Sequence, residues 1–209
     1  MKPSFRLIRV LTAPTVTKSD MMGRPTADNV QAELATRWCV LPTDIDLFGH
    51  MTNSRYALLM DYARVHYLRT AGLLTPALKE RWFMPVSMVN VDFHRPLKPF
   101  ERFEIATQVL SWDQRWIFMQ QTFRTCQRPD RTVATGYVKS IVRSPSGVVA
   151  PARVARMVCG RDVQPPALSY ALWARFHAGP HTTVGGHTAR QTPRDNGRSR
   201  VDLDLQRPA

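Results

Sequence analysis

A carboxylate, an imidazole and a carboxamide lie within eight residues of one another: Asp46, His50 and Asn53. A carboxylate can activate water or attack a carbonyl, and an imidazole can orient water or protonate a leaving group. Thr52, Asn53 and Ser54 are good helix caps before an apolar run, so we expect a helix to begin there. Its first turn would present free backbone N–H groups beside the carboxylate. This pattern predicts a hydrolytic site.

Asp46 is the predicted catalytic acid, acting as general base or as nucleophile, and residue types alone do not choose between these routes. The competing interpretation is that Asp46 only stabilises a turn. The N–H group of Thr52 or Asn53 is the predicted oxyanion donor, because the helix dipole favours negative charge there. Asn53 either caps the helix or places its amide near the reacting carbonyl. His50 is either a participant or a structural hydrogen-bonding residue.

Asp44 is a second acid, and we expect it to point to the same side as Asp46 if this segment is a strand end. A structural hydrogen bond or salt bridge is the preferred role for Asp44. With His50 the two acids offer a set of hard metal ligands, but no second histidine or carboxylate follows at a suitable spacing, so no metal and no cofactor are predicted. The chain also lacks a Gly-x-Ser-x-Gly nucleophile motif.

The elements that must position these residues can be predicted from apolar periodicity. A strand over 33–41 precedes the cluster, and a helix over 54–70 follows it, ending at Gly72. One helical stripe contains Tyr56, Leu59, Met60, Ala63 and Tyr67, and a second contains Leu58, Tyr62 and Val65, which predicts a buried helix. Four strands are expected at 84–93, 103–112, 116–125 and 132–142. Their short connections favour antiparallel neighbours.

Shorter helices are expected within 75–82, 151–159 and 168–176. The predicted organisation is a loose N-terminal leader (1–30), one main domain (31–160), a C-terminal helical extension (161–178) and a disordered basic tail (179–209). Three widely spaced cysteines argue against a disulfide framework and favour the reducing cytoplasm. Residues 1–10 are too short and too broken in pattern for a membrane span.

The charge is strongly basic: 29 Lys and Arg against 16 Asp and Glu give +13 over 209 residues. Nucleic acid, a membrane surface or a polyanionic small ligand would each suit such a charge. No basic run or aromatic–basic RNA-binding motif accompanies it, so nucleic acid is not a predicted partner. A solvated basic surface is the preferred interpretation. The hydrophobic fraction of 44% is that of an ordinary globular domain.

The segment 40–64 resembles the acyl-CoA thioesterases of the 4-hydroxybenzoyl-CoA thioesterase group. The closer resemblance is to the branch called thioesterase superfamily member six. It is carried by Leu-Pro-Thr-Asp-Ile-Asp at 41–46, Met-Asp-Tyr-Ala-Arg-Val at 60–65, Lys-Pro-Phe-Glu at 98–101, Ser-Trp-Asp at 111–113 and Pro-Pro-Ala-Leu at 165–168. It covers roughly residues 34–175, and Thr52 stands where that family usually has Asn.

The resemblance implies an α+β hotdog fold, with one long central helix wrapped by an antiparallel sheet of about five strands. It also implies hydrolysis of an acyl-CoA or acyl-carrier-protein thioester by a homodimer or a dimer of dimers. In one branch of hotdog thioesterases the acid comes from the central helix, which makes Asp61 the runner-up, although a buried Asp61–Arg64 ion pair is preferred. Arg95, Lys98 and Arg102 become candidates for the coenzyme A phosphates. Thr52 motivates the alternative of a non-catalytic hotdog protein that binds an acyl ligand.

Overall fold

The computed structural model describes residues 25–26 and 28–177. The expected tail at 179–209 and most of the expected leader lie outside these residues, so both stay predictions. The described residues contain the whole expected main domain from residue 31 to residue 160, together with nearly all of the expected helical extension.

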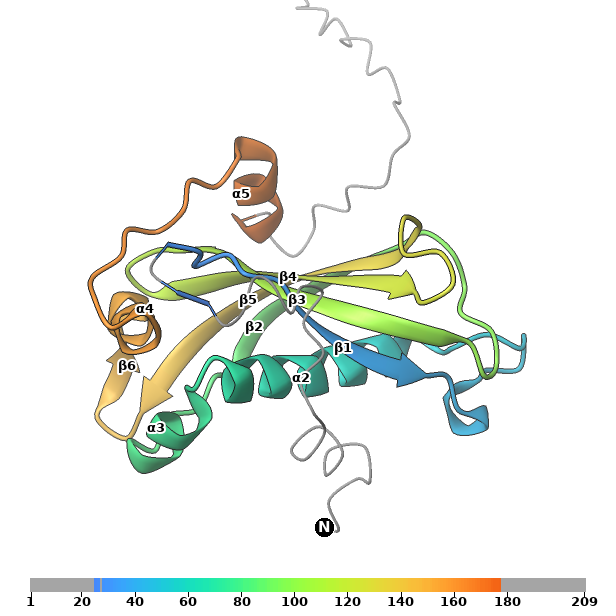
Figure 1. Cartoon of the computed structure of the whole chain (residues 1–209), viewed down its shortest axis with the longest axis horizontal. Coiled ribbons are helices and arrows are strands. Elements are labelled where there is room, and N and C mark those ends of the chain that lie inside the picture. Colours follow the sequence, from blue (N-terminus) through green and yellow to red (C-terminus); the bar gives the residue numbers. More distant parts are fainter. Residues whose placement is uncertain (1–24, 27, 178–209) are drawn as a thin grey trace, which may run out of the picture. The chain divides into compact units, whose positions relative to one another are not determined.

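The sheet has six antiparallel strands, shown in Figure 1. They are β1 (Leu34–Cys39), β2 (Val86–Phe93), β3 (Arg102–Trp112), β4 (Trp116–Thr125), β5 (Thr132–Ser144) and β6 (Gly147–Val149). The five longer strands were all predicted, within two residues at each end. The short strand β6 pairs only with the end of β5 and was missed, because three residues are too few to show periodicity.

The strand order is β1-β3-β4-β5-β2, so one expectation about neighbours was wrong. Strands β2 and β3 follow each other in the sequence but do not pair: β2 pairs with β5, and β3 with β1 and β4. The connection over 94–101 leads the chain from the β2 edge to the far side of the sheet. A short connection favours pairing only when it forms a hairpin turn, and this segment instead crosses the end of the sheet.

The long helix α2 (Asn53–Thr70) begins one residue before the predicted start and ends where predicted. Gly72 has φ 76°, a left-handed conformation that favours glycine. Its N–H donates to the Arg69 carbonyl at 3.1 Å, and the Leu73 N–H donates to the Leu68 carbonyl at 2.9 Å. These are the two hydrogen bonds of a Schellman motif, which stops the helix. No helix in the described part of the chain is long and apolar enough to cross a bilayer.

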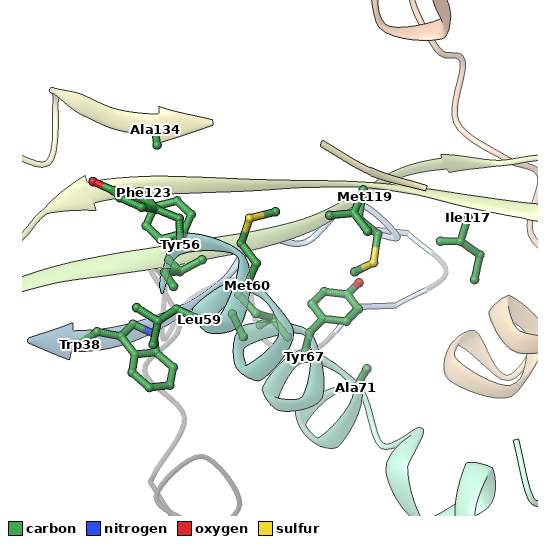
Figure 2. Close-up of a cluster of buried hydrophobic side chains, with 14 of the residues drawn as sticks. Trp38, Tyr56, Leu59, Met60, Tyr67, Ala71, Ile117, Met119, Phe123 and Ala134 are labelled. Atoms are coloured by element: carbon green, nitrogen blue, oxygen red, sulfur yellow. The ribbon is translucent and has the colours of Figure 1, made fainter. Parts of the chain in front are cut away.

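The core lies between α2 and the sheet (Figure 2). The first predicted stripe is buried, and Tyr56, Met60 and Tyr67 point from α2 toward the strands. The second stripe is only half-buried, so α2 keeps one partly open side. Gly136 in β5 leaves room for the end of the Met60 side chain, because a Cβ atom there would lie 2.3 Å from Met60 Cε.

The described residues contain three shorter α-helices: α3 (Leu74–Lys79), α4 (Pro151–Cys159) and α5 (Tyr170–His177). The predicted bounds of α4 are confirmed, and α5 starts two residues later than expected. Helix α5 covers the sheet face opposite α2, where Phe176 packs on Leu110 and Phe118. It is held by Lys139 Nζ, which donates to the Phe176 carbonyl at 3.2 Å, and by the Arg175 ion pair with Asp92 at 2.6 Å.

Candidate functional site

The predicted acid Asp46 lies in a tight loop directly before α2. The Asp46 N–H donates to the His50 carbonyl at 2.9 Å, and the Gly49 N–H donates to the Asp46 carbonyl at 3.2 Å. A bridge between Ile45 and Met51 closes the base of the loop. Gly49 has φ 79°, which favours glycine at this position. The loop therefore brings Asp46 and His50 together at the N-terminal end of α2.

The two carboxylate oxygens of Asp46 have different surroundings. Oδ1 accepts hydrogen bonds from the backbone N–H groups of Phe48 at 2.9 Å and His50 at 3.2 Å. Oδ2 accepts none from any described residue, and the side chain is half-buried. The turn-stabilising role considered for Asp46 is therefore real, but it uses one oxygen and leaves the other available for water or for a substrate carbonyl.

His50 is also half-buried, and its ring makes no hydrogen bond within residues 28–177. Its backbone shapes the loop, whereas its imidazole remains available to a ligand. Asn53 is exposed and is the first residue of α2, so the expectation that it caps the helix was wrong. Thr52 occupies the cap position, and its hydroxyl lies 3.2 Å from the Ser54 hydroxyl instead of bonding a backbone N–H.

The two predicted oxyanion donors differ. The Thr52 N–H donates to the Asp44 carbonyl at 2.9 Å and is therefore occupied. The N–H groups of Asn53 and Ser54 have no acceptor among the described residues. The start of α2 thus offers two neighbouring donors with the positive end of the helix dipole behind them. Ser54 was missed as a donor because the occupation of Thr52 cannot be read from residue types.

The basis for expecting Asp44 to point to the same side as Asp46 was wrong. Residues Pro42–Asp44 form a 3-10 helix, so the alternation expected of a strand does not apply. The Asp44 side chain is 1% exposed; its Oδ2 accepts the Leu41 N–H at 2.8 Å, and its Oδ1 lies 3.5 Å from Arg55 Nε. The preferred structural role is therefore confirmed. Arg55 also donates to the Thr43 carbonyl at 3.0 Å and ties this turn to the first turn of α2.

Asp61, the runner-up acid, forms the expected ion pair with Arg64, but its side chain is 61% exposed, so the expectation that the acid is buried was wrong. Arg64 is buried, and its Nη1 donates to Gln121 Oε1 at 2.9 Å. Gln121 in turn donates from Nε2 to the Met60 carbonyl at 3.0 Å. Burial lowers the pKa of the Arg64 guanidinium to about 10. This buried network anchors α2 to β4, and Gln121 was not predicted because a glutamine in a strand usually faces solvent.

The three predicted phosphate-binding residues do not gather in one place. Arg95 and Lys98 line a groove of about 500 Å³, whereas Arg102 lies in a separate hollow of about 380 Å³. The 94–101 connection that carries Lys98 is tied to the site loop, because the Met51 N–H donates to the Leu97 carbonyl at 2.9 Å. Figure 1 shows the site loop, the 94–101 connection and the β4–β5 turn at the end of the sheet where α2 begins.

A cavity of about 110 Å³ lies at the other end of α2. Its wall is almost entirely apolar and includes Tyr67, Trp82, Met119 and Val154. Tyr67 follows Asn53 by fourteen residues, which is about 21 Å along a helix. The buried side chains of Tyr56 and Met60 lie between the two positions. The cavity is therefore separate from the candidate site.

Comparison of the sequence with known proteins identifies the family of this chain. The Thioesterase-like superfamily matches residues 40–152, more than half of the chain. Protein THEM6 of Danio rerio is 28% identical over 152 residues, covering 71% of this chain and 72% of that protein.

Solved structures show the same fold. The YbaW probable thioesterase of Escherichia coli superposes with a TM-score of 0.54 at 17% identity, covering 59% of this chain and 94% of that one. A Staphylococcus aureus protein in complex with CoA gives a TM-score of 0.54 at 11% identity, covering 67% of this chain and 90% of that one. The chain therefore belongs to the Thioesterase-like superfamily: it has the hotdog fold, and its class of reaction is thioester hydrolysis.

Proposed function

We propose that this protein hydrolyses an acyl-CoA thioester to a free acid and coenzyme A, with Asp46 as the reacting carboxylate. The observation that carries the proposal is that the two carboxylate oxygens of Asp46 have different surroundings. Oδ1 is held by two backbone N–H groups, so the carboxylate is fixed, while Oδ2 has no donor among the described residues. A fixed carboxylate with one open oxygen suits a general base or a nucleophile.

The start of α2 complements this carboxylate. The thioester carbonyl oxygen would accept hydrogen bonds from the Asn53 and Ser54 N–H groups, where the helix dipole stabilises the developing negative charge. The Asp46 Oδ2 atom then removes a proton from the attacking water, or attacks the carbonyl and forms an anhydride that water opens. The His50 imidazole, which has no partner in the described residues, protonates the departing thiolate. The side-chain amide of Asn53, which is exposed at the start of α2, would be a further donor to the thioester carbonyl.

Isotope labelling distinguishes the two routes. One turnover in ¹⁸O-labelled water with enzyme in excess places label only in the product acid if Asp46 is a general base. If Asp46 is the nucleophile, water can open the anhydride at the enzyme carbonyl, and the Asp46 peptide gains label. Mass spectrometry of that peptide reads the result directly, with the Asp61 peptide as an internal control.

The proposed substrate carrier is coenzyme A, with an acyl carrier protein as the other form of delivery. The basic groove beside the site loop attracts phosphates, and the structural neighbour from Staphylococcus aureus was solved with CoA. Cys39, Cys126 and Cys159 are present as thiols, which fits the cytoplasm as the proposed compartment.

A homodimer is the proposed assembly, formed by β2. This strand lies at the edge of the sheet and pairs only with β5. Val86, Val89 and Phe93 on it are 37%, 44% and 45% exposed. An eight-residue edge strand with exposed apolar side chains readily pairs with another strand, and a second copy of β2 is self-complementary in the antiparallel sense.

Such a dimer places the partner subunit near the candidate site. The centroids of the Phe93 and Tyr56 rings lie 5.0 Å apart in an edge-on arrangement. The end of β2 therefore adjoins the first turn of α2. Leu47 and Phe48, at the tip of the site loop, are 103% and 84% exposed. A neighbouring subunit beside β2 would cover apolar side chains that a lone subunit leaves in water.

The test is thiol release from a panel of acyl-CoAs, from short to long aliphatic chains and including benzoyl types. Asp46→Asn keeps an acceptor oxygen for the Phe48 and His50 N–H groups but removes the charge. We expect a folded protein whose rate falls by about 10²- to 10⁴-fold. Asp46→Ala should lose the same activity and also stability. The chain's own thiols, among them the exposed Cys126, also react with a thiol reagent, and a substrate-free blank removes their contribution.

A binding protein without turnover is the second candidate, favoured by the occupied Thr52 N–H and by the turn-forming hydrogen bonds of Asp46. It predicts acyl-CoA binding with no thiol release from any member of the panel. It also predicts that Asp46→Asn leaves the affinity unchanged. Release by wild type that disappears in a folded Asp46→Asn protein would reject this candidate.

A further inference from the structure

The groove beside the site loop carries more positive charge than its own acids neutralise. Its lining contains Arg95, Lys98, Arg128 and Arg131 against Glu101, four cations minus one anion, a balance of +3. Glu101 is committed to shaping the 94–101 connection, since it pairs with Arg95 and accepts the Lys98 backbone N–H at 3.0 Å. Lys98, Arg128 and Arg131 have no carboxylate partner among the described residues. Three unpaired cations therefore face one groove of about 500 Å³.

The cations come from two segments that are distant in the sequence. Lys98 lies in the connection between β2 and β3, and Arg128 and Arg131 lie in the turn between β4 and β5. That turn is internally fixed: the Arg128 N–H donates to Thr125 Oγ1 at 3.2 Å, and the Arg131 N–H donates to the Arg128 carbonyl at 3.0 Å. The two guanidinium groups are thus presented from an ordered backbone, which lowers the entropic cost of binding a ligand.

Phe100 lines the same groove in an unusual conformation. Its φ is 62°, a left-handed value that a bulky residue rarely adopts, and its side chain is 67% exposed. The conformation is held by the residue that follows β1, because the Phe100 N–H donates to the Val40 carbonyl at 3.0 Å. Backbone strain that the surroundings enforce is concentrated at ligand sites. Here it presents an aromatic ring to solvent beside the cations instead of burying it.

We propose that this groove binds the phosphorylated adenosine end of coenzyme A, with Arg128, Arg131 and Lys98 on the phosphates and Phe100 stacked on the adenine. Planar guanidinium groups match phosphate oxygens in pairs, and an exposed aromatic ring stacks with any base. This assignment rests on the proposed function and extends it, because it identifies free coenzyme A as the carrier that the enzyme selects. A carrier protein has no adenosine to place on Phe100.

The position of the groove agrees with this role. The Met51–Leu97 hydrogen bond joins the site loop to the groove loop, so the pantetheine arm of one ligand would run from the groove to the start of α2. The charge would also draw the ligand in from solution, and this part of the attraction is weakened by salt.

Direct binding tests the groove without relying on catalysis. Adenosine 3′,5′-bisphosphate is titrated calorimetrically into full-length wild type, Arg128→Gln/Arg131→Gln, Phe100→Ala and the control Arg115→Gln/Arg143→Gln. The control removes two exposed arginines that lie away from the groove. We expect binding about 10- to 100-fold weaker in the double groove variant, weaker binding in Phe100→Ala, and wild-type affinity in the control. Equal affinity in all four proteins would overturn the proposal.

A kinetic comparison separates the groove from the proposed function. The ratio of kcat/KM for acyl-CoA to that for the matching acyl-pantetheine should fall by a similar factor in Arg128→Gln/Arg131→Gln and stay constant in the control. If the protein hydrolyses thioesters but the ratio is unchanged in Arg128→Gln/Arg131→Gln, the adenosine site in the groove is rejected and the thioesterase activity is retained. Binding that depends on the groove without hydrolysis of any thioester rejects the thioesterase and leaves the groove. A variant impaired only toward an acyl carrier protein overturns the groove as an adenosine site.

Discussion

The Met51 N–H donates to the Leu97 carbonyl at 2.9 Å and so joins the loop carrying Asp46 to the loop carrying Lys98. Leu97 itself is fully buried. The candidate catalytic residues and the candidate phosphate groove therefore share one anchor in the core.

Leu97→Ala should weaken this anchor. The side chain is fully buried, so its truncation should cost about 2–5 kcal/mol of unfolding free energy through lost transfer and a residual cavity. We also expect kcat/KM for acyl-CoA to fall, because both loops lose their common support. Urea titration and thiol release measure the two effects. Leu78→Ala, at a side chain that is 69% exposed, is the matched control and should change stability by less than about 0.5 kcal/mol.

Asp44→Asn should separate a structural acid from a chemical one. The amide still accepts the Leu41 N–H but no longer neutralises Arg55, so we expect a loss of about 1–3 kcal/mol in unfolding free energy. Activity per folded molecule should stay within a few-fold of wild type, unlike in Asp46→Asn. Arg55→Gln and the double variant complete a cycle whose coupling energy measures the pair. A collapse of kcat in a stable Asp44→Asn protein would contradict the structural assignment.

Asp61→Asn tests the runner-up acid. Asp61 is 61% exposed and pairs with the buried Arg64, so its neutralisation should leave thiol release close to wild type. Loss of activity in Asp61→Asn, with Asp46 intact, would instead identify Asp61 on α2 as the catalytic acid.

Gln121→Leu removes the buried partner of Arg64. We expect it to lower the free energy of unfolding by at least about 2 kcal/mol, because a charged donor is left unsatisfied. Gln120→Leu, at the adjacent half-buried glutamine on β4, provides the control.

Stability should decline in alkali because of Tyr56. Burial raises the pKa of Tyr56 to about 12, against about 10 in the unfolded chain. The neutral form is the one that folding favours, so this stabilisation is complete below about pH 10 and disappears as the pH rises through 12. Two pKa units correspond to about 3 kcal/mol. Urea titrations across this range should show a shallower decline for Tyr56→Phe, and an identical slope would contradict the assignment.

Val89→Lys should separate the subunits. Val89 is 44% exposed on the unpaired edge of β2, and lysine on an edge strand opposes strand pairing. Light scattering after size-exclusion chromatography should show a dimeric wild type and a monomeric variant. Val148→Lys, at a valine that is 47% exposed on β6, carries the same change at another place and should remain dimeric. A monomeric wild type at micromolar concentration would remove the proposed interface.

The predictable part of the fold is the part with strong local periodicity. Helix α2 ends at the predicted residue because Gly72 signals the stop, and β4 has the predicted bounds because its apolar run lies between two turns. The pairing of β2 with β5 was not predictable in this way, because local sequence specifies a strand but not its neighbour. It required knowing that the connection around Leu97 crosses the sheet end and packs under α2.

The candidate site shows the same division. Asp46 and His50 were identifiable from residue type and spacing, and the structure places them on one loop. The occupation of the Thr52 N–H depends on the 3-10 turn at Pro42–Asp44, which no short-range pattern indicated. Arg128 belongs beside Lys98 only because the β4–β5 turn meets the 94–101 connection in space. Contacts between segments thirty residues apart are properties of the topology.

Helix α5 has a consequence for how many copies can associate. It occupies the outer face of the sheet and pairs with Asp92 on the β2 edge, so the chain blocks its own second surface for stacking. A protein shortened before Tyr170 would expose Leu110 and Phe118 on this face of the sheet and should form higher-order particles that sediment faster than the full-length species. We therefore expect α5 to limit how many subunits associate.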